Sequence, residues 1–84
     1  MNSKQRRTLA AIFADPISGT IKWQAIEAML RALGATVEED SGSRVHFLLN
    51  GRKATFHRPH PSPDTDKGAV KAMRRFLLSA GVRP

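Results

Sequence analysis

The chain has 84 residues and a formal net charge of +7, from 14 Lys and Arg against seven Asp and Glu. This length excludes two independent lobes, and we expect residues 1–84 to form a single domain. Cysteine is absent, which excludes disulfides, thiolate catalysis and thiolate metal cages. No apolar run approaches the ~20 residues of a membrane span and the N-terminus lacks a signal-peptide pattern, so we expect a cytoplasmic protein.

The basic residues are concentrated in the second half of the chain. Residues 1–41 carry five basic and five acidic side chains, whereas residues 42–84 carry nine basic and two acidic side chains. Such a basic segment indicates a polyanionic partner, either nucleic acid or an acidic protein. The alternative is that these cations only keep the domain soluble, but solubility does not require that they be segregated.

Two helices are predicted in the first half. Residues 4–14 favour a short helix that ends before Pro16, because a proline disfavours helix at the residue that precedes it. The polar segment 18–20 supplies an N-cap for a second helix, which ends at Gly34. The apolar stripe of this second helix consists of Trp23, Ile26, Leu30 and Leu33.

Three strands follow, because the hydrophobic period changes from 3.6 residues to 2. We expect them at residues 35–39, 44–49 and 52–57, with a turn at residues 40–43. Asn50 and Gly51 accept the positive φ angles of a two-residue type I′ hairpin. This turn fixes the register of the last two strands and places Arg44 opposite His57.

The alternation of side chains gives the hairpin two different faces. The apolar face, which we expect to join the core, carries Val45, Phe47, Ala54 and Phe56. The opposite face carries Arg44, His46, Lys53, Thr55 and His57. Two imidazoles, two cations and a hydroxyl are therefore predicted to share one surface.

A Pro-rich segment and a third helix complete the chain. Residues 58–63 contain alternate prolines, so we expect them to run extended along the surface. Asp64, Thr65 or Asp66 then caps a helix that ends at Gly81. Its apolar stripe consists of Val70, Met73, Leu77 and Ala80, and its basic side of Lys67, Lys71, Arg74 and Arg75.

The order helix, helix, three strands, helix predicts an α+β fold with a small three-stranded antiparallel sheet. We expect the helices to pack on one face of this sheet and to leave the opposite face open. The imidazoles should project from that open face. Trp23 and the phenylalanines are expected in the core, with Phe13 as the one aromatic side chain that could be exposed.

Histidines among cations suit the cleavage of a phosphodiester bond in RNA. His46 or His57 would take or give the proton, while Arg44 would stabilise the charge that develops on the phosphoryl group. This reaction needs no metal and no cofactor. A metal site of His46, His57 and His60 has poor chelating geometry. A Ser43 nucleophile with His57 would need a carboxylate, and we expect no acid on that face.

The same residues without catalysis would form a phosphate-binding surface. Basic side chains of the last helix could likewise contact the phosphates of an A-form duplex. The candidate RNA-binding residues are Ser43, Lys53, Thr55, Arg58, His60, Lys67, Lys71, Arg74 and Arg75.

A series of short motifs in this order resembles the HicA toxins of bacterial type II toxin–antitoxin systems. The motifs are Leu33-Gly34-Ala35 after an amphipathic helix, Gly42-Ser43 before a hairpin, the Pro-flanked His60-Pro61, and Ala80-Gly81-Val82 after the closing helix. The resemblance covers residues 20–82 and leaves residues 1–18 as an N-terminal helical extension. It implies a fold like the double-stranded RNA-binding domain, ribonuclease activity on mRNA that arrests translation, and neutralisation by a HicB antitoxin.

One position departs from the family pattern. Members typically carry a catalytic histidine directly after the Gly-Ser pair, where this chain has Arg44. His46 or His57 could replace that imidazole. One alternative is a module that has lost cleavage and binds only RNA or an antitoxin. Another is a protein whose basic helix binds an acidic protein, so that any binding of nucleic acid is incidental.

Overall fold

The computed structural model describes residues 1–84 and contains three helices and three strands. In chain order these are α1 (Ser3–Ile12), α2 (Trp23–Ala32), β1 (Thr36–Glu39), β2 (Arg44–Leu49), β3 (Arg52–His57) and α3 (Lys67–Ser79). The predicted α+β class and element order are confirmed. Helix α1 ends two residues earlier than the 4–14 range that the sequence predicts.

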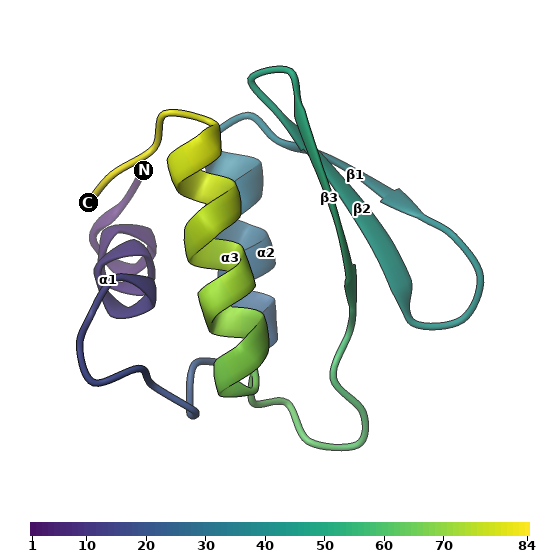
Figure 1. Cartoon of the computed structure of the whole chain (residues 1–84), viewed down its shortest axis with the longest axis horizontal. Helices are drawn as coiled ribbons and strands as arrows, with labels where there is room; N and C mark the ends of the chain where they lie inside the picture. The colour runs from purple at the N-terminus through teal and green to yellow at the C-terminus, as the bar shows by residue number, and fades with distance from the viewer.

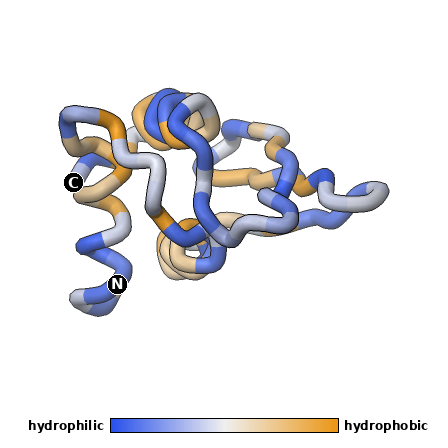
Figure 2. Tube along the Cα trace, turned by 90° about the horizontal axis from the view of Figure 1, so that it is seen from below, coloured by the Kyte–Doolittle hydropathy of each residue, from blue (hydrophilic) through white to orange (hydrophobic).

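The helices lie on one side of a three-stranded antiparallel sheet with the strand order β1-β2-β3. Both α2 and α3 lie next to the sheet, and α1 lies beyond them, farthest from the strands (Figure 1). The end-on view in Figure 2 shows α2 and α3 as two separate rods with the strands to one side of them. No helix covers the opposite face of the sheet, as the amphipathic pattern predicts.

The core is one cluster of 16 buried residues that joins the helices to the inner sheet face. The apolar stripe of α3 and the inward side chains Val45, Phe47 and Phe56 are all buried in it. Trp23 of α2 lies against Phe47 and Phe56, with ring centroids 5.9–6.0 Å apart. Aromatic pairs at this separation and tilt stabilise a core beyond the area that they bury.

The β2–β3 hairpin has the register that its turn predicts. Asn50 and Gly51 adopt φ angles of 51° and 78°, which match a two-residue turn of the primed type. Arg44 pairs with His57 and His46 with Thr55. The Asn50 side chain also donates a hydrogen bond of 2.8 Å to the Ala80 carbonyl at the end of α3.

The N-terminus of α2 is fixed by tertiary contacts rather than by a cap. The prediction that residues 18–20 cap this helix is wrong, because the helix begins at Trp23 and its N-cap residue, Lys22, makes no side-chain cap. Lys22 forms an isolated β-bridge with Asp64, and the Trp23 N–H donates to the Pro63 carbonyl at 2.9 Å. For α3, Asp66 is the cap, since its carboxylate accepts from the Ala69 N–H at 2.8 Å.

Helix α1 is part of the packed structure. Its Leu9 and Ile12 are buried in the common core. Arg74 of α3 holds the end of the helix by donating to the carbonyls of Ile12 and Ala14, each at 2.9 Å. Phe13 is half-buried beneath the Arg74 guanidinium, whose carbon lies 5.8 Å from the ring centroid, so the expectation of an exposed Phe13 is wrong.

Candidate functional site on the uncovered sheet face

His46 lies at the middle of the central strand, on the face that no helix covers. Its Nδ1 lies 2.7 Å from the Thr55 hydroxyl of β3, its cross-strand partner. Its Nε2 lies 3.0 Å from Oδ2 of Asp40, in the turn between β1 and β2. Both ring nitrogens are therefore held, and the imidazole has one fixed orientation on the sheet.

The face also carries carboxylates, so the expectation that it has no acid is wrong. Asp40 contacts His46 directly, and Glu38 of β1 is the Cα partner of His46 on the other side. Glu38 could have been predicted on this face from the sequence. Pairing the first strand with the second across the 40–43 turn would have placed Glu38 beside His46. The turn conformation that brings Asp40 back to the imidazole had no such signal.

Arg44 and His57 flank His46 on the same face. They are cross-strand partners at the open end of the hairpin. His57 is diagonal to His46 in this register, a relationship that places such side chains roughly 7–8 Å apart. The Arg44 guanidinium lies 3.3 Å from Oδ2 of Asp40, the same oxygen that contacts His46. His46 and Arg44 thus share one carboxylate oxygen, and His57 lies opposite Arg44 on the neighbouring strand.

The pKa of Asp40 is lowered from its ordinary value. The main cause is the hydrogen bond with His46; the positive charge of Arg44 acts in the same direction. Asp40 is therefore ionised over the neutral pH range and acts only as an acceptor toward His46.

A shallow hollow of about 160 Å³ lies beside His46. It is lined by Thr36, Glu38, His46, Phe47, Leu48 and Lys53. Leu48 is 45% exposed there, and Lys53 of β3 pairs across the strands with it. The uncovered face is thus mixed in charge, with apolar surface beside the imidazole, rather than uniformly basic.

The remaining candidate RNA-binding residues fall into separate places. Lys67, Lys71 and Arg75 are exposed on α3, which lies on the other side of the sheet from His46. Ser43 is exposed in the β1–β2 turn and His60 in the Pro-rich segment. Arg58 and Arg74 are half-buried and engaged in contacts within the protein.

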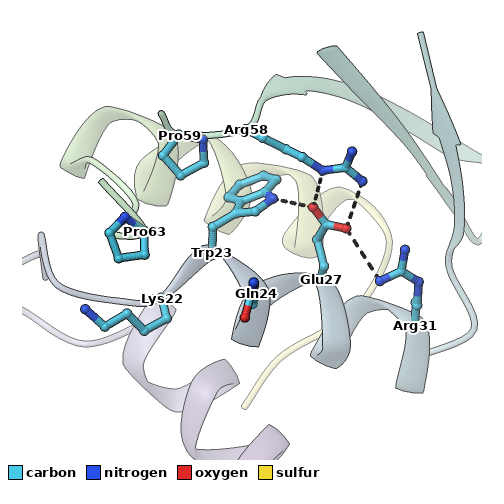
Figure 3. Close-up of a pocket in the computed structure, with 8 residues that line it drawn as sticks. All are labelled: Lys22, Trp23, Gln24, Glu27, Arg31, Arg58, Pro59 and Pro63. Atoms are coloured by element: carbon cyan, nitrogen blue, oxygen red, sulfur yellow. Dashed lines mark hydrogen bonds and ion pairs between the residues drawn. The ribbon is translucent and has the colours of Figure 1, made fainter. Parts of the chain in front are cut away.

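Arg58 belongs to a partly buried network at the first turns of α2. Its guanidinium donates to both carboxylate oxygens of Glu27, at 2.7 and 3.1 Å, and to Glu39 of β1 at 2.8 Å. The Trp23 indole N–H and Arg31 also contact the Glu27 carboxylate (Figure 3). The network lies beside a pocket of about 570 Å³ between α2 and the Pro-rich segment.

The charges around this pocket are paired internally. Burial would raise the pKa of Glu27, but the hydrogen bonds from Arg58 and Trp23 and the charges of Arg58 and Arg31 outweigh it and lower that pKa. The hydrogen bonds to Glu27 and Glu39 raise the pKa of Arg58 in turn. Lys22 at the rim is paired with Asp64 at 2.6 Å. The paired residues around the pocket therefore have a structural role, because they connect α2, β1 and the segment after β3.

The sequence did not predict the network of Glu27 and Arg58, whose contacts Figure 3 shows. Glu27 lies four residues after Trp23 and three before Leu30, on the apolar side of α2. An acid at such a position indicates a buried partner, and that signal was available. The identity of the partner was not, because Arg58 is 31 residues away in the chain.

None of the three helices is both long enough and apolar enough to cross a membrane.

The fold and the site define a small basic α+β protein with a histidine-bearing sheet face that its own helices leave open. Residues 23–82 match the family model of the HicA toxin of bacterial toxin–antitoxin systems. The match spans more than half of the chain, which therefore belongs to the HicA toxin family. It runs from α2 to the residues after α3 and leaves α1 outside. Membership implies an antitoxin partner. Comparisons with curated proteins and with solved structures found no match.

Proposed function

We propose that this HicA-family protein is a metal-independent endoribonuclease that cleaves mRNA in the cytoplasm, arrests translation and is neutralised by a HicB-like antitoxin. The observation that carries the proposal is the arrangement of His46, His57 and Arg44 on one uncovered sheet face. A flat, open face of this kind admits an extended polymer, whereas a closed pocket would not.

The chemistry requires a base for the 2′-hydroxyl, an acid for the leaving oxygen and a cation for the phosphoryl group. Two imidazoles on adjacent strands supply the first two, since imidazole exchanges protons near neutral pH. Arg44 supplies the cation. Its side chain is half-exposed and lies at the same end of the hairpin as His57. Arg44 thus occupies the family's usual histidine position, while the imidazoles come from its neighbours.

Binding of the RNA backbone is assigned to the exposed polar and basic side chains around this face. Ser43, Lys53 and Thr55 lie on it or at its edge, and His60 lies in the segment that follows β3. Lys67, Lys71 and Arg75 would provide a second contact for a longer RNA that reaches around to α3. Arg58 and Arg74 are left out of this interface because their guanidinium groups are already hydrogen-bonded within the protein.

A second candidate is a module that binds RNA or an antitoxin without cleavage. The observation that favours the antitoxin-binding form of this module is the pair of carboxylates, Glu38 and Asp40, on the same face, because they repel phosphate. Arg44 in place of the family histidine points in the same direction.

Cleavage of end-labelled RNA in the presence of EDTA separates the two candidates. We expect products from the wild type and a loss of at least about 100-fold in the double variant His46→Ala/His57→Ala, the scale of lost acid–base catalysis. Lys4→Ala, an exposed change on α1, is the control and should cleave normally. A salt-sensitive shift of the RNA without products would support the binding module instead.

A further inference from the structure

His46 forms the centre of a hydrogen-bonded line that runs across the sheet from Asp40 to Thr55. Asp40 Oδ2 lies 3.0 Å from Nε2, and Thr55 Oγ1 lies 2.7 Å from Nδ1. The His46 side chain is 15% exposed, whereas that of Asp40 is 42% exposed. Nothing in the sequence pattern or in the family match assigns a role to Asp40.

The chemistry of the partners decides where the proton of a neutral His46 lies. An ionised carboxylate can only accept a hydrogen bond, so Nε2 must carry the hydrogen that points to Asp40. In a neutral imidazole the other nitrogen is then an acceptor. Nδ1 is therefore the basic atom, and the Thr55 hydroxyl donates to it.

The surrounding charges are consistent with an ionised Asp40. Arg44 lies 3.3 Å from the same carboxylate oxygen that contacts His46. The other titratable groups that face His46 are Glu38 of β1, and Lys53 and His57 of β3. The lowered pKa of Asp40 fits the two contacts that it makes, with His46 and with Arg44.

We propose that Asp40 is a positioning residue that fixes His46 as the Nε2–H tautomer and so makes Nδ1 the atom that accepts the proton from RNA. This inference rests on the proposed ribonuclease function. Thr55 holds Nδ1 until the substrate 2′-hydroxyl takes its place. The 2′-hydroxyl proton then moves to Nδ1, the 2′-oxygen bonds to phosphorus, and the bond from phosphorus to the 5′-oxygen breaks.

The remaining proton transfer completes the balance. The leaving 5′-oxygen takes its proton from the imidazolium of His57, and the products are a 2′,3′-cyclic phosphate and a 5′-hydroxyl. The carboxylate of Asp40 stabilises the positive charge that His46 acquires. Because one oxygen of Asp40 contacts both His46 and Arg44, the same residue orients the base and the cation.

The tautomer is measured directly by long-range ¹H–¹⁵N NMR of the imidazole rings in the full-length protein. In the wild type we expect neutral His46 to be mainly the Nε2–H form. In Asp40→Asn we expect the Nδ1–H form to rise several-fold, because an amide can donate to Nε2. Glu38→Gln, which removes the other acid of the face, should leave the tautomer unchanged, and an unshifted indole N–H signal of the buried Trp23 reports an intact fold.

A kinetic measurement on the same variants completes the test. Asp40→Asn should lower kcat by at least about 10-fold with little change in KM, because an imidazole in the wrong tautomer cannot accept the proton at Nδ1. Lys4→Ala, added as the exposed control on α1, should cleave at the wild-type rate. A wild-type His46 that is mainly Nδ1–H, or an Asp40→Asn variant with unchanged kcat in a protein that does cleave RNA, would overturn the role of Asp40. The predicted tautomers without any cleavage by the wild type would instead overturn the ribonuclease and leave the positioning by Asp40 standing.

Discussion

Glu27 is a carboxylate on the buried side of α2, a place where a charged side chain is normally unfavourable. It is tolerated because donors from Trp23, Arg58 and Arg31 satisfy its oxygens. Arg58 in turn reaches Glu39, and its own N–H donates to the Ser43 carbonyl at 2.8 Å. The network around Glu27 therefore holds both ends of the turn that contains Asp40.

This network gives stability a pH dependence. The pKa of Glu27 is lower in the folded protein than its ordinary value of 4.5. Its contribution is thus fully present above pH 4.5 and is lost as the pH falls through the lower folded pKa. We expect Glu27→Gln to destabilise the protein by about 1–3 kcal/mol at pH 7, since hydrogen bonds to a charged group are weakened.

Urea unfolding of the wild type and Glu27→Gln at pH 7 and pH 3 measures this difference. The gap between the two midpoints should narrow at pH 3, which lies below the ordinary pKa of 4.5, because the unfolded chain then binds a proton that lowers the stability of the folded, ionised form. Glu38→Gln, at an exposed position, should have nearly the wild-type midpoint at pH 7. A gap of equal size at both pH values would show that the charge of Glu27 does not stabilise the fold.

At the scale of elements, α3 carries two adjacent arginines with different surroundings. Arg74 is directed toward the end of α1, whereas Arg75 is exposed. The sequence assigned both to RNA binding because they share the basic side of one helix. The two arginines differ because α1 packs beside Arg74, which donates to the carbonyl of Ile12, 62 residues earlier in the chain. Arg74 is therefore structural, whereas Arg75 is free.

These two positions form a matched pair for experiment. Arg74→Ala should destabilise the protein by about 1–3 kcal/mol, because it leaves the carbonyls of Ile12 and Ala14 without their donor. Arg75→Ala should change stability by less than about 0.5 kcal/mol and should weaken RNA binding instead. Thermal unfolding and RNA titration at two salt concentrations measure both quantities. A destabilised Arg75→Ala with normal RNA binding would contradict the assignment.

The elements that the sequence predicted well are those with strong local signals. Asn50-Gly51 determined the turn, and the turn determined the register that places Arg44 opposite His57. The helices followed from apolar stripes of period 3.6 and from Gly34 and Gly81, whose φ angles are 96° and 79°. The contacts that were missed, His46 with Asp40 and Arg58 with Glu27, depend on loop conformation and on long-range packing, which local propensity does not encode.

At the scale of the whole molecule, the two faces of the sheet have different roles, because helices cover only one of them. Helices α2 and α3 cover the inner face, α1 packs behind them, and the outer face stays open (Figures 1 and 2). The net charge of +7 favours encounter with a polyanion. In the proposed function, the fixed imidazole of His46 is the place where that encounter leads to chemistry. The central claim of the proposed function is therefore that RNA binds and reacts on the outer sheet face.

NMR mapping with an RNA oligonucleotide that cannot be cleaved, because its 2′-hydroxyls are methylated, tests that claim most directly. We expect the imidazole signals of His46 and His57 and the methyl signals of Leu48 to shift together as RNA is added. Methyl signals of Ala10 and Ala28, on α1 and α2, should stay in place. Shifts confined to α1, or to Trp23 and the pocket beside Arg58, with the two imidazoles unmoved, would contradict it.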